Sequence, residues 1–240
     1  MADYRSYRDT ASKAFMESIG FDARRDAVYP DIAFSLPAPT STREQGADHA
    51  PLTVGVGVMA YHGWLKQNTS ARVYNEYLAK LTDFVLWLLD RGHLVRVLIG
   101  DLIDRSAVED LVTNVRKARP ELPPDRLLAC PSDSLQGLMQ EMAATDVVVA
   151  TRFHNIICAL KAGKPVVSIG YGEKNAVLLV EMGLQGFCQR IDGLQCDLLI
   201  EQFTRLVANR QRYAQSIRAA TLALRERLDQ QGSLLAARLL

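Results

Sequence analysis

The amino-acid sequence predicts an α/β protein with a Rossmann-like parallel sheet and helices on both faces. Short apolar segments alternate with longer amphipathic ones, which is the pattern of βαβ units, and such units join parallel strands. The clearest unit is DVVVATRFHNIICALKAGKPVVSIGYGEK at residues 146–174. Counting the alternations along the chain gives about six strands.

The central unit contains two buried strands with a helix between them. The apolar run 147–150 is short enough for a strand that is buried on both faces. Apolar residues from Ile156 to Leu160 recur at helical spacing, and Gly163 ends that helix. Residues 165–169 predict the second strand, and the turn at 170–172 leads into another helix.

The segments on either side of this unit continue the same alternation. Apolar runs and helical periodicity predict further strands at 52–59, 93–99, 127–129 and 187–191. Amphipathic patterns predict helices at 74–89, 107–118, 135–144 and 196–209, followed by a long helix to the C-terminus. Gly92 is expected to end the first of these helices, and Ser132-Asp133-Ser134 is the expected cap of the third.

The N-terminal part differs from the rest. Residues 4–19 predict a helix that Gly20 ends, and 27–29 and 32–34 predict short extended pieces. Residues 36–51 are rich in Pro, Ser, Thr and charge, which is typical of a linker. We therefore expect residues 1–36 to be a fragment of a preceding domain, 37–51 to be a linker and 52–240 to form the Rossmann-like domain.

Composition limits the possible partners. The chain has 240 residues and a formal net charge of +1, so no global field attracts it to nucleic acid or to acidic lipid. No run of 18 apolar residues occurs, and the N-terminus MADYRSYRDT is no signal peptide. We expect no nucleic-acid partner, no transmembrane segment and a cytoplasmic location.

The cysteines do not indicate a metal site. Cys130, Cys158, Cys188 and Cys196 are widely spaced and form no CxxC motif. Such residues are typical of reduced thiols in a protein core. We expect neither a metal nor a cofactor.

Polar residues follow both strands of the central unit. Arg152 and His154 come after the first strand, and Lys174 comes just past the second. Open parallel sheets bind ligands at the carboxyl ends of their strands, where helix N-termini present free N–H groups. The residues predict a site for a phosphate or a carboxylate. The alternative is that these side chains only donate hydrogen bonds to backbone carbonyls of the loops, or that Arg152 forms an ion pair with Asp146 or Asp101.

The same stretch resembles the polysaccharide pyruvyl transferase family. The segments ATRFHNIICALKAGKPVVSIGYGEKN and EMGLQGFCQRID carry the resemblance. The matching residues are Arg152, Phe153, His154, Gly163, Lys164, Pro165, Tyr171 and Lys174. Near the N-terminus, Tyr7-Arg8-Asp9 and Val28-Tyr29-Pro30-Asp31 are similar to two further family elements, which normally lie near the middle of a longer protein.

The resemblance implies a fold, a reaction and partners. The fold would be the C-terminal, donor-binding half of a glycosyltransferase-B (GT-B) architecture, without the N-terminal domain. The activity would be transfer of the pyruvyl group of phosphoenolpyruvate onto a sugar as a ketal, in the biosynthesis of cell-surface polysaccharide or exopolysaccharide. The expected partners are phosphoenolpyruvate, a sugar or glycan acceptor, and either a second copy of the chain or a separate N-terminal domain.

The resemblance also suggests roles for single residues. His154 is the candidate catalytic acid, which would protonate the enol methylene, or else a phosphate contact. The candidate substrate-binding residues are Arg152, Lys174, Tyr171, Asn155, His62 and Tyr61. In the loop after the first strand the family often has a basic donor contact, whereas this chain has no arginine there before Lys66.

Two other functions stay open at this point. Glu173 and Glu181 have the E-x7-E spacing of retaining nucleotide-sugar glycosyltransferases of the same fold. Activity that depends on Glu173 would favour that class. A truncated, non-catalytic binding domain is the third possibility, and it would bind donor without turning it over.

Overall fold

The computed structural model describes residues 4–39, 51–61 and 70–239. These residues fall into two compact units, one within Met1–Pro37 and Arg218–Leu240 and the other within Ala38–Ile217. This division groups the C-terminal residues with the N-terminal segment, whereas the sequence prediction placed them in the Rossmann-like domain. The proposed domain boundaries stay a prediction.

The larger unit is built on a six-stranded sheet with the order β5-β4-β3-β6-β7-β8, in which every pairing is parallel. Its strands are β3 (Thr53–Val58), β4 (Leu94–Ile99), β5 (Leu127–Cys130), β6 (Val147–Ala150), β7 (Val166–Gly170) and β8 (Cys188–Arg190). All residues of β3, β6 and β7 are buried. The sequence prediction of a parallel α/β fold is therefore confirmed.

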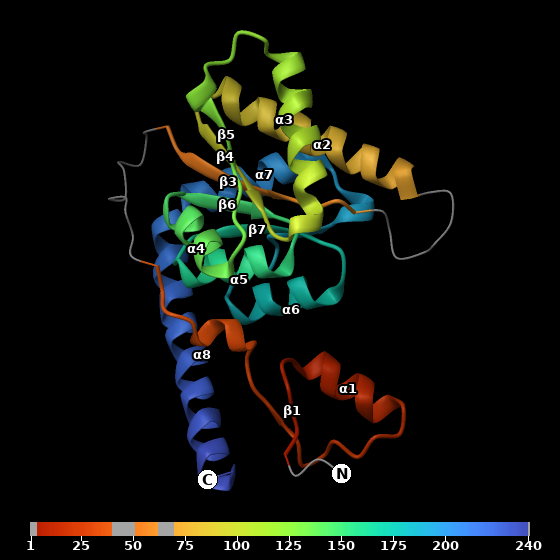
Figure 1. Cartoon of the computed structure of the whole chain (residues 1–240), viewed down its shortest axis with the longest axis vertical. Coiled ribbons are helices and arrows are strands. Elements are labelled where there is room, and N and C mark those ends of the chain that lie inside the picture. Colours follow the sequence, from red (N-terminus) through yellow and green to blue (C-terminus); the bar gives the residue numbers. More distant parts are fainter. Residues whose placement is uncertain (1–3, 40–50, 62–69, 240) are drawn as a thin grey trace. The chain divides into compact units, whose positions relative to one another are not determined.

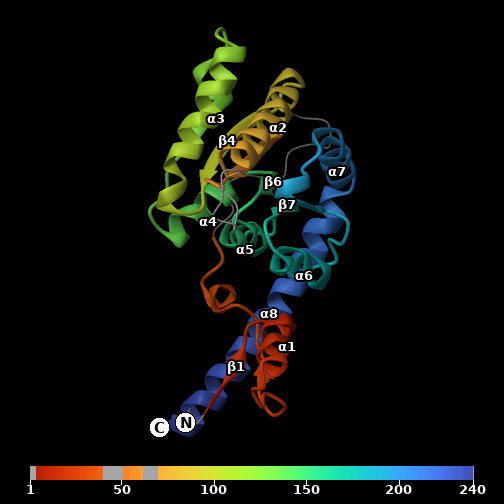
Figure 2. The same ribbon diagram turned by 90° about the vertical axis from the view of Figure 1, so that its right-hand side faces the viewer.

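Helices cover both faces of this sheet (Figure 1). One face carries α2 (Ser70–Asp90), α3 (Arg105–Ala118) and α7 (Cys196–Ala208), with α2 packed against the other two. The other face carries α4 (Leu135–Ala143), α5 (Phe153–Lys161) and α6 (Glu173–Glu181), with α5 packed against both neighbours. Figure 2 shows the same two layers from the side.

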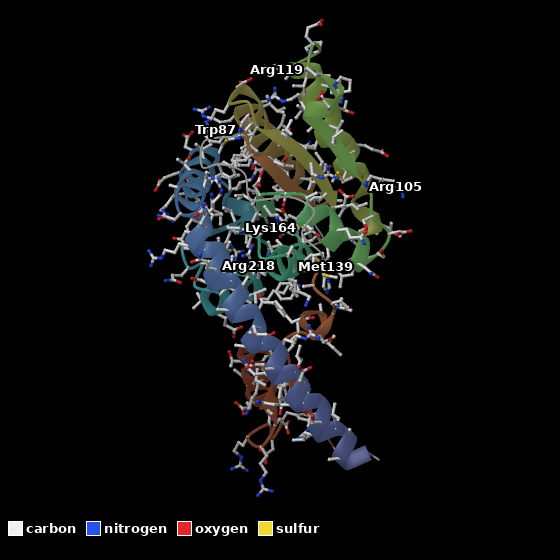
Figure 3. All side chains as sticks on the ribbon, turned by 90° about the vertical axis from the view of Figure 1, so that its left-hand side faces the viewer. Trp87, Arg105, Arg119, Met139, Lys164 and Arg218 are labelled. Carbon is white, nitrogen blue, oxygen red and sulfur yellow. The ribbon has the colours of Figure 1, made fainter. Side chains whose placement is uncertain are left out.

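The connections explain this arrangement. Each crossover helix leaves the carboxyl edge of the sheet and returns the chain to the amino edge, as right-handed βαβ connections do. Arg105 and Arg119 accordingly mark the two ends of α3 (Figure 3). Left-handed glycines end the helices where the sequence predicted, with φ of +85° at Gly92 and +68° at Gly163.

The smaller unit corrects two predictions. Ser6–Tyr7 form β1, a short strand that pairs in parallel with β2 (Ala27–Val28), so the predicted helix over 4–19 begins only at Thr10. The delay has a local cause, because the Asp9 side chain caps α1 (Thr10–Ser18) by accepting from the Ser12 amide at 2.6 Å.

The second correction concerns residues 32–34. They form part of a 3-10 helix (Ile32–Ser35), which the Asp31 side chain caps by accepting from the Ala33 amide at 3.0 Å. The part of α8 (Arg210–Leu239) that belongs to this unit contains Arg227, which donates to the Val28 carbonyl at 2.9 Å. No helix among the described residues combines the length and apolar character needed to cross a membrane.

Candidate functional site

The strand order places a topological switch point between β3 and β6. From β3 the chain builds outward through β4 and β5, and it then returns to add β6, β7 and β8 on the other side. Loops on either side of such a point diverge and leave a crevice outside the carboxyl ends of the strands. Tyr61 lies in the loop after β3, whereas the predicted His62 falls outside the described residues.

Arg152, at the end of β6, is held by Asp104. Its Nε and Nη2 atoms donate to the two carboxylate oxygens of Asp104 at 2.7 and 2.8 Å. Asp104 is fully buried and also accepts from the Ala60 amide at 2.9 Å. The hydrogen bonds that Arg152 donates to Asp104 raise the pKa of Arg152, so the guanidinium stays charged.

This pairing corrects one alternative from the sequence and refines the role of Arg152. The partner is Asp104 rather than Asp146 or Asp101. One carboxylate thereby ties together the chain segments that follow β3, β4 and β6. Arg152 still has N–H groups beyond the two that Asp104 accepts, so its structural role leaves donors for a ligand.

The Lys174 ammonium is positioned by aromatic rings. It lies over the ring of Phe153 and over the ring of Tyr171, at 4.9 Å from each centroid. Among the residues that the structure describes, no carboxylate forms an ion pair with Lys174. Cation–π contacts fix the position of an ammonium without neutralising its charge. Lys174 therefore presents a positioned cation beside the start of α6.

Two tyrosines connect this cation to the end of β3. The rings of Tyr61 and Tyr171 lie 6.4 Å apart, and Tyr61 is buried with 8% of its surface exposed. Burial, followed by the charge of Asp192, raises the pKa of Tyr61, so its hydroxyl stays protonated at neutral pH. Tyr61, from the segment after β3, thus lies beside the predicted residues Tyr171 and Lys174, which belong to the turn after β7 and to the start of α6.

His154 faces solvent at the second position of α5. Its ring packs edge-on against Phe153, with 6.1 Å between the centroids. Phe153 also contacts Lys174, so His154 and Lys174 share one aromatic neighbour. The first N–H groups of α5 have no intrahelical partners and open toward the same edge. An imidazole, an ammonium and a helix N-terminus are therefore neighbours.

Asn155 points into the interior of the protein, unlike the exposed His154 before it. Its side chain is fully buried and lies against Gly57 and Gly100, where a Cβ on either glycine would collide with the amide. Neither amide atom of Asn155 has a hydrogen-bond partner in the described part of the chain. In this conformation its amide lies beneath the carboxyl edge rather than on its surface.

A buried polar network next to the carboxyl ends of β6 and β7 was not predicted from the sequence. The Asn175 amide donates to the Ser168 hydroxyl at 2.9 Å and to the Thr151 carbonyl at 3.3 Å, and the hydroxyls of Thr151 and Tyr77 are 2.7 Å apart. All four residues are buried, so these bonds fix the start of α6 against the ends of β6 and β7. The signal in the sequence was a polar residue directly after Lys174.

The two glutamates of the E-x7-E spacing lie at opposite ends of α6. Glu173 is its first residue and Glu181 its last, and both are exposed. A rise of about 1.5 Å per residue puts about 12 Å of helix between them. Only Glu173 is at the carboxyl edge. No cluster of three or more metal-ligating side chains occurs among the residues described.

Comparison with known proteins identifies the family. The model of the polysaccharide pyruvyl transferase family matches residues 1–173 of the 240. The chain belongs to this family. The match includes Arg152, His154 and Tyr171 and ends one residue before Lys174. A comparison with curated protein sequences returned no match.

Comparison with solved structures supports the fold. An α,α-trehalose 6-phosphate synthase from Burkholderia multivorans has a TM-score of 0.59 at 14% identity, over 98% of this chain and 59% of the other. The UDP-forming α,α-trehalose-phosphate synthase from Burkholderia vietnamiensis has a TM-score of 0.58 at 13% identity, and the match covers 92% of this chain and 55% of the other. An O-GlcNAc transferase mutant from Thermobaculum terrenum has a TM-score of 0.53 at 18% identity, and the match covers 80% of this chain and 35% of the other.

These structures are glycosyltransferases of the GT-B fold, so the fold of this family member is of the GT-B type. At such low identity the likeness shows the fold alone. The chain spans between 35% and 59% of the length of these three proteins. Its assignment to the C-terminal half of the architecture stays a prediction.

Proposed function

We propose that this chain is a polysaccharide pyruvyl transferase, or its donor-binding half, and that phosphoenolpyruvate binds at the carboxyl ends of β6 and β7. The observation that carries the proposal is family membership over residues 1–173, which include Arg152 and His154 at the start of α5. The positioned ammonium of Lys174 between Phe153 and Tyr171 supports it, because the donor is a small polyanion.

Each group in the site has a task in the proposed reaction. Lys174, the remaining N–H groups of Arg152 and the first amides of α5 would bind the carboxylate and the phosphate of the donor. His154 would give a proton to the methylene carbon, which becomes a methyl group and leaves the central carbon electrophilic. The same cations would balance the charge that develops on the departing phosphate.

The remaining steps balance without a redox partner. One sugar hydroxyl adds to the central carbon and loses its proton. The C–O bond to phosphate then breaks, a second hydroxyl adds and loses its proton, and the ketal closes. Of the two hydroxyl protons, one replaces the proton given by His154 and the other leaves with the phosphate.

The second candidate is a nucleotide-sugar glycosyltransferase, which the fold of the solved structures favours. The position of Glu173 at the carboxyl edge is the feature of this chain that fits it. Under this alternative Glu173→Gln abolishes activity, whereas under pyruvyl transfer it has little effect. A non-catalytic binding domain is the third candidate.

Parallel calorimetric titrations separate these candidates. The purified chain is titrated with phosphoenolpyruvate and, separately, with a nucleoside diphosphate-sugar. Pyruvyl transfer predicts heat with phosphoenolpyruvate alone. Heat with the nucleotide alone would overturn the proposal in favour of glycosyl transfer. Binding of phosphoenolpyruvate without phosphate release in the presence of sugar acceptors would identify a donor-binding domain that does not complete the reaction.

A further inference from the structure

A concave surface lies on the carboxyl edge of the sheet, beside β4 and β5. It is a cavity of about 240 Å³ formed by the segments after these strands and by the start of α4. Its lining residues are Ile99, Gly100, Asp101, Leu102, Ser132, Asp133, Ser134 and Leu135. Small-molecule sites of drug size are typically ~300–1000 Å³, so this cavity suits one sugar ring better than a whole nucleotide.

The described lining residues are rich in oxygen and include no lysine, arginine or histidine. Asp101 and Asp133 contribute carboxylates, and Ser132 and Ser134 contribute hydroxyls. Carboxylates accept strong hydrogen bonds from hydroxyl groups. Two negative charges also disfavour a polyanion such as phosphoenolpyruvate. The cavity is therefore complementary to a neutral polyol.

Free hydrogen-bonding capacity at the cavity supports this. Asp101 uses one oxygen to cap the 3-10 helix Leu102–Asp104 through the Ile103 amide, at 3.3 Å. Asp133 is exposed, and in the described ranges nothing donates to its carboxylate. The Ser134 hydroxyl accepts from the Gly137 amide at 3.1 Å, which leaves its proton available to donate.

The wall of the cavity at Gly100 is packed against Asn155. The buried Asn155 amide oxygen lies directly against Gly100, at the place where a side chain on Gly100 would otherwise sit. Both polar atoms of Asn155 are fully buried without partners among the described residues. Asn155 therefore closes the interior side of this wall behind Gly100, and its amide does not line the cavity.

The cavity is also next to the proposed donor site. A Cβ on Gly100 would lie 2.8 Å from the Cβ and Cγ of Arg152, so Gly100 separates the cavity from the Arg152 loop. We propose that this cavity binds a pyranose ring of the acceptor through its hydroxyl groups. The acceptor role rests on the proposed pyruvyl transfer, and binding of a sugar ring does not.

Nuclear magnetic resonance on the ¹⁵N-labelled chain tests this inference. The probes are the methyl glycosides of glucose, galactose and mannose, and phosphoenolpyruvate in a separate titration. The expected result is that at least one glycoside shifts the amide signals of Gly100, Asp133 and Leu135, and that phosphoenolpyruvate shifts those of His154 and Lys174.

A matched pair of variants gives the second readout. Asp133→Asn should weaken glycoside binding about tenfold, the effect of one hydrogen bond to a charged group. Asp125→Asn should leave glycoside binding unchanged, because Asp125 is equally exposed but lies before the amino end of β5, at the opposite edge. Both positions are on the surface, so both variants are expected to fold.

The possible failures are distinguishable. If no glycoside shifts the cavity amides, or if phosphoenolpyruvate shifts them instead, the acceptor inference is overturned and the proposed function can still stand. If Asp133→Asn and Asp125→Asn bind the glycoside with equal affinity, the acceptor inference is overturned as well. Glycoside binding at the cavity without any binding of phosphoenolpyruvate would support the sugar site and refute the proposed function.

Discussion

At the scale of single residues, Arg152 shows how one side chain can serve the fold and a ligand together. Its bidentate hydrogen bonds to the buried Asp104 fix the segment between β6 and α5, and His154 is the second residue of α5. Removing either partner leaves the other uncompensated. A loss of donor binding in an Arg152 variant is therefore informative only when the stability of that variant is known.

Arg152→Met should lower the free energy of unfolding by about 3–5 kcal/mol, since Asp104 would keep a buried charge without its partner. The double variant Arg152→Met/Asp104→Asn should recover much of this loss, because the neutral amide can still accept from the Ala60 amide. Urea denaturation measures both. Equal destabilisation in the single and double variants would contradict the account.

The cysteines give a second prediction at this scale. Burial raises the pKa of Cys130 and of Cys158 to about 12, so both thiols stay protonated and unreactive in the folded protein below that pH. At about pH 8.5, where an unfolded thiol is half ionised, an alkylating reagent should modify them slowly in buffer and rapidly in denaturant. Mass spectrometry of the two peptides checks this, and fast native labelling would refute it.

At the scale of elements, glycines at strand ends determine how closely α5 approaches the sheet. Gly57 ends the paired part of β3 against β6, and Gly100 follows β4. Their missing side chains make room for Asn155 and Arg152. The sequence contains both glycines, but their partners became clear only with the packing of α5.

Gly100→Ala should destabilise the larger unit by about 1–3 kcal/mol, because a Cβ there overlaps Arg152 and Asn155. Gly193→Ala is the matched control, since a Cβ at that position has no neighbour within 4 Å. Thermal unfolding of the two variants compares them. A Gly100→Ala variant as stable as the control would show that α5 can shift without cost.

Local patterns predicted the elements of the larger unit well, and those of the N-terminal segment less well. Buried strands such as β6 and helix ends at Gly92 and Gly163 depend on nearby residues, so they could be read from the sequence. The pairing of Ser6–Tyr7 with Ala27–Val28 depends on residues about twenty positions apart. The helical spacing of apolar residues over 4–19 predicted a helix at Ser6–Tyr7 in place of this strand.

At the scale of the whole molecule, strand order decides which side chains meet. The sequence indicated that Arg152, His154 and Lys174 follow adjacent strands, and the structure brings His154 and Lys174 to the ring of Phe153. It did not indicate Asp104, because β4 and β6 are both neighbours of β3, a relation that no local pattern contains. Long-range topology thus accounts for the part of the site that was missed.

The central claim is that the carboxyl ends of β6 and β7 bind the anionic donor, and Lys174 tests it most directly. The measurement is calorimetric titration of phosphoenolpyruvate into the wild-type chain, Lys174→Met and Lys117→Met. Lys117 is an exposed lysine near the end of α3, at the opposite edge of the sheet. The account predicts binding weakened by about 1.5–3 kcal/mol in Lys174→Met and unchanged in Lys117→Met. Equal affinity of all three proteins, or no binding by the wild type, would contradict it.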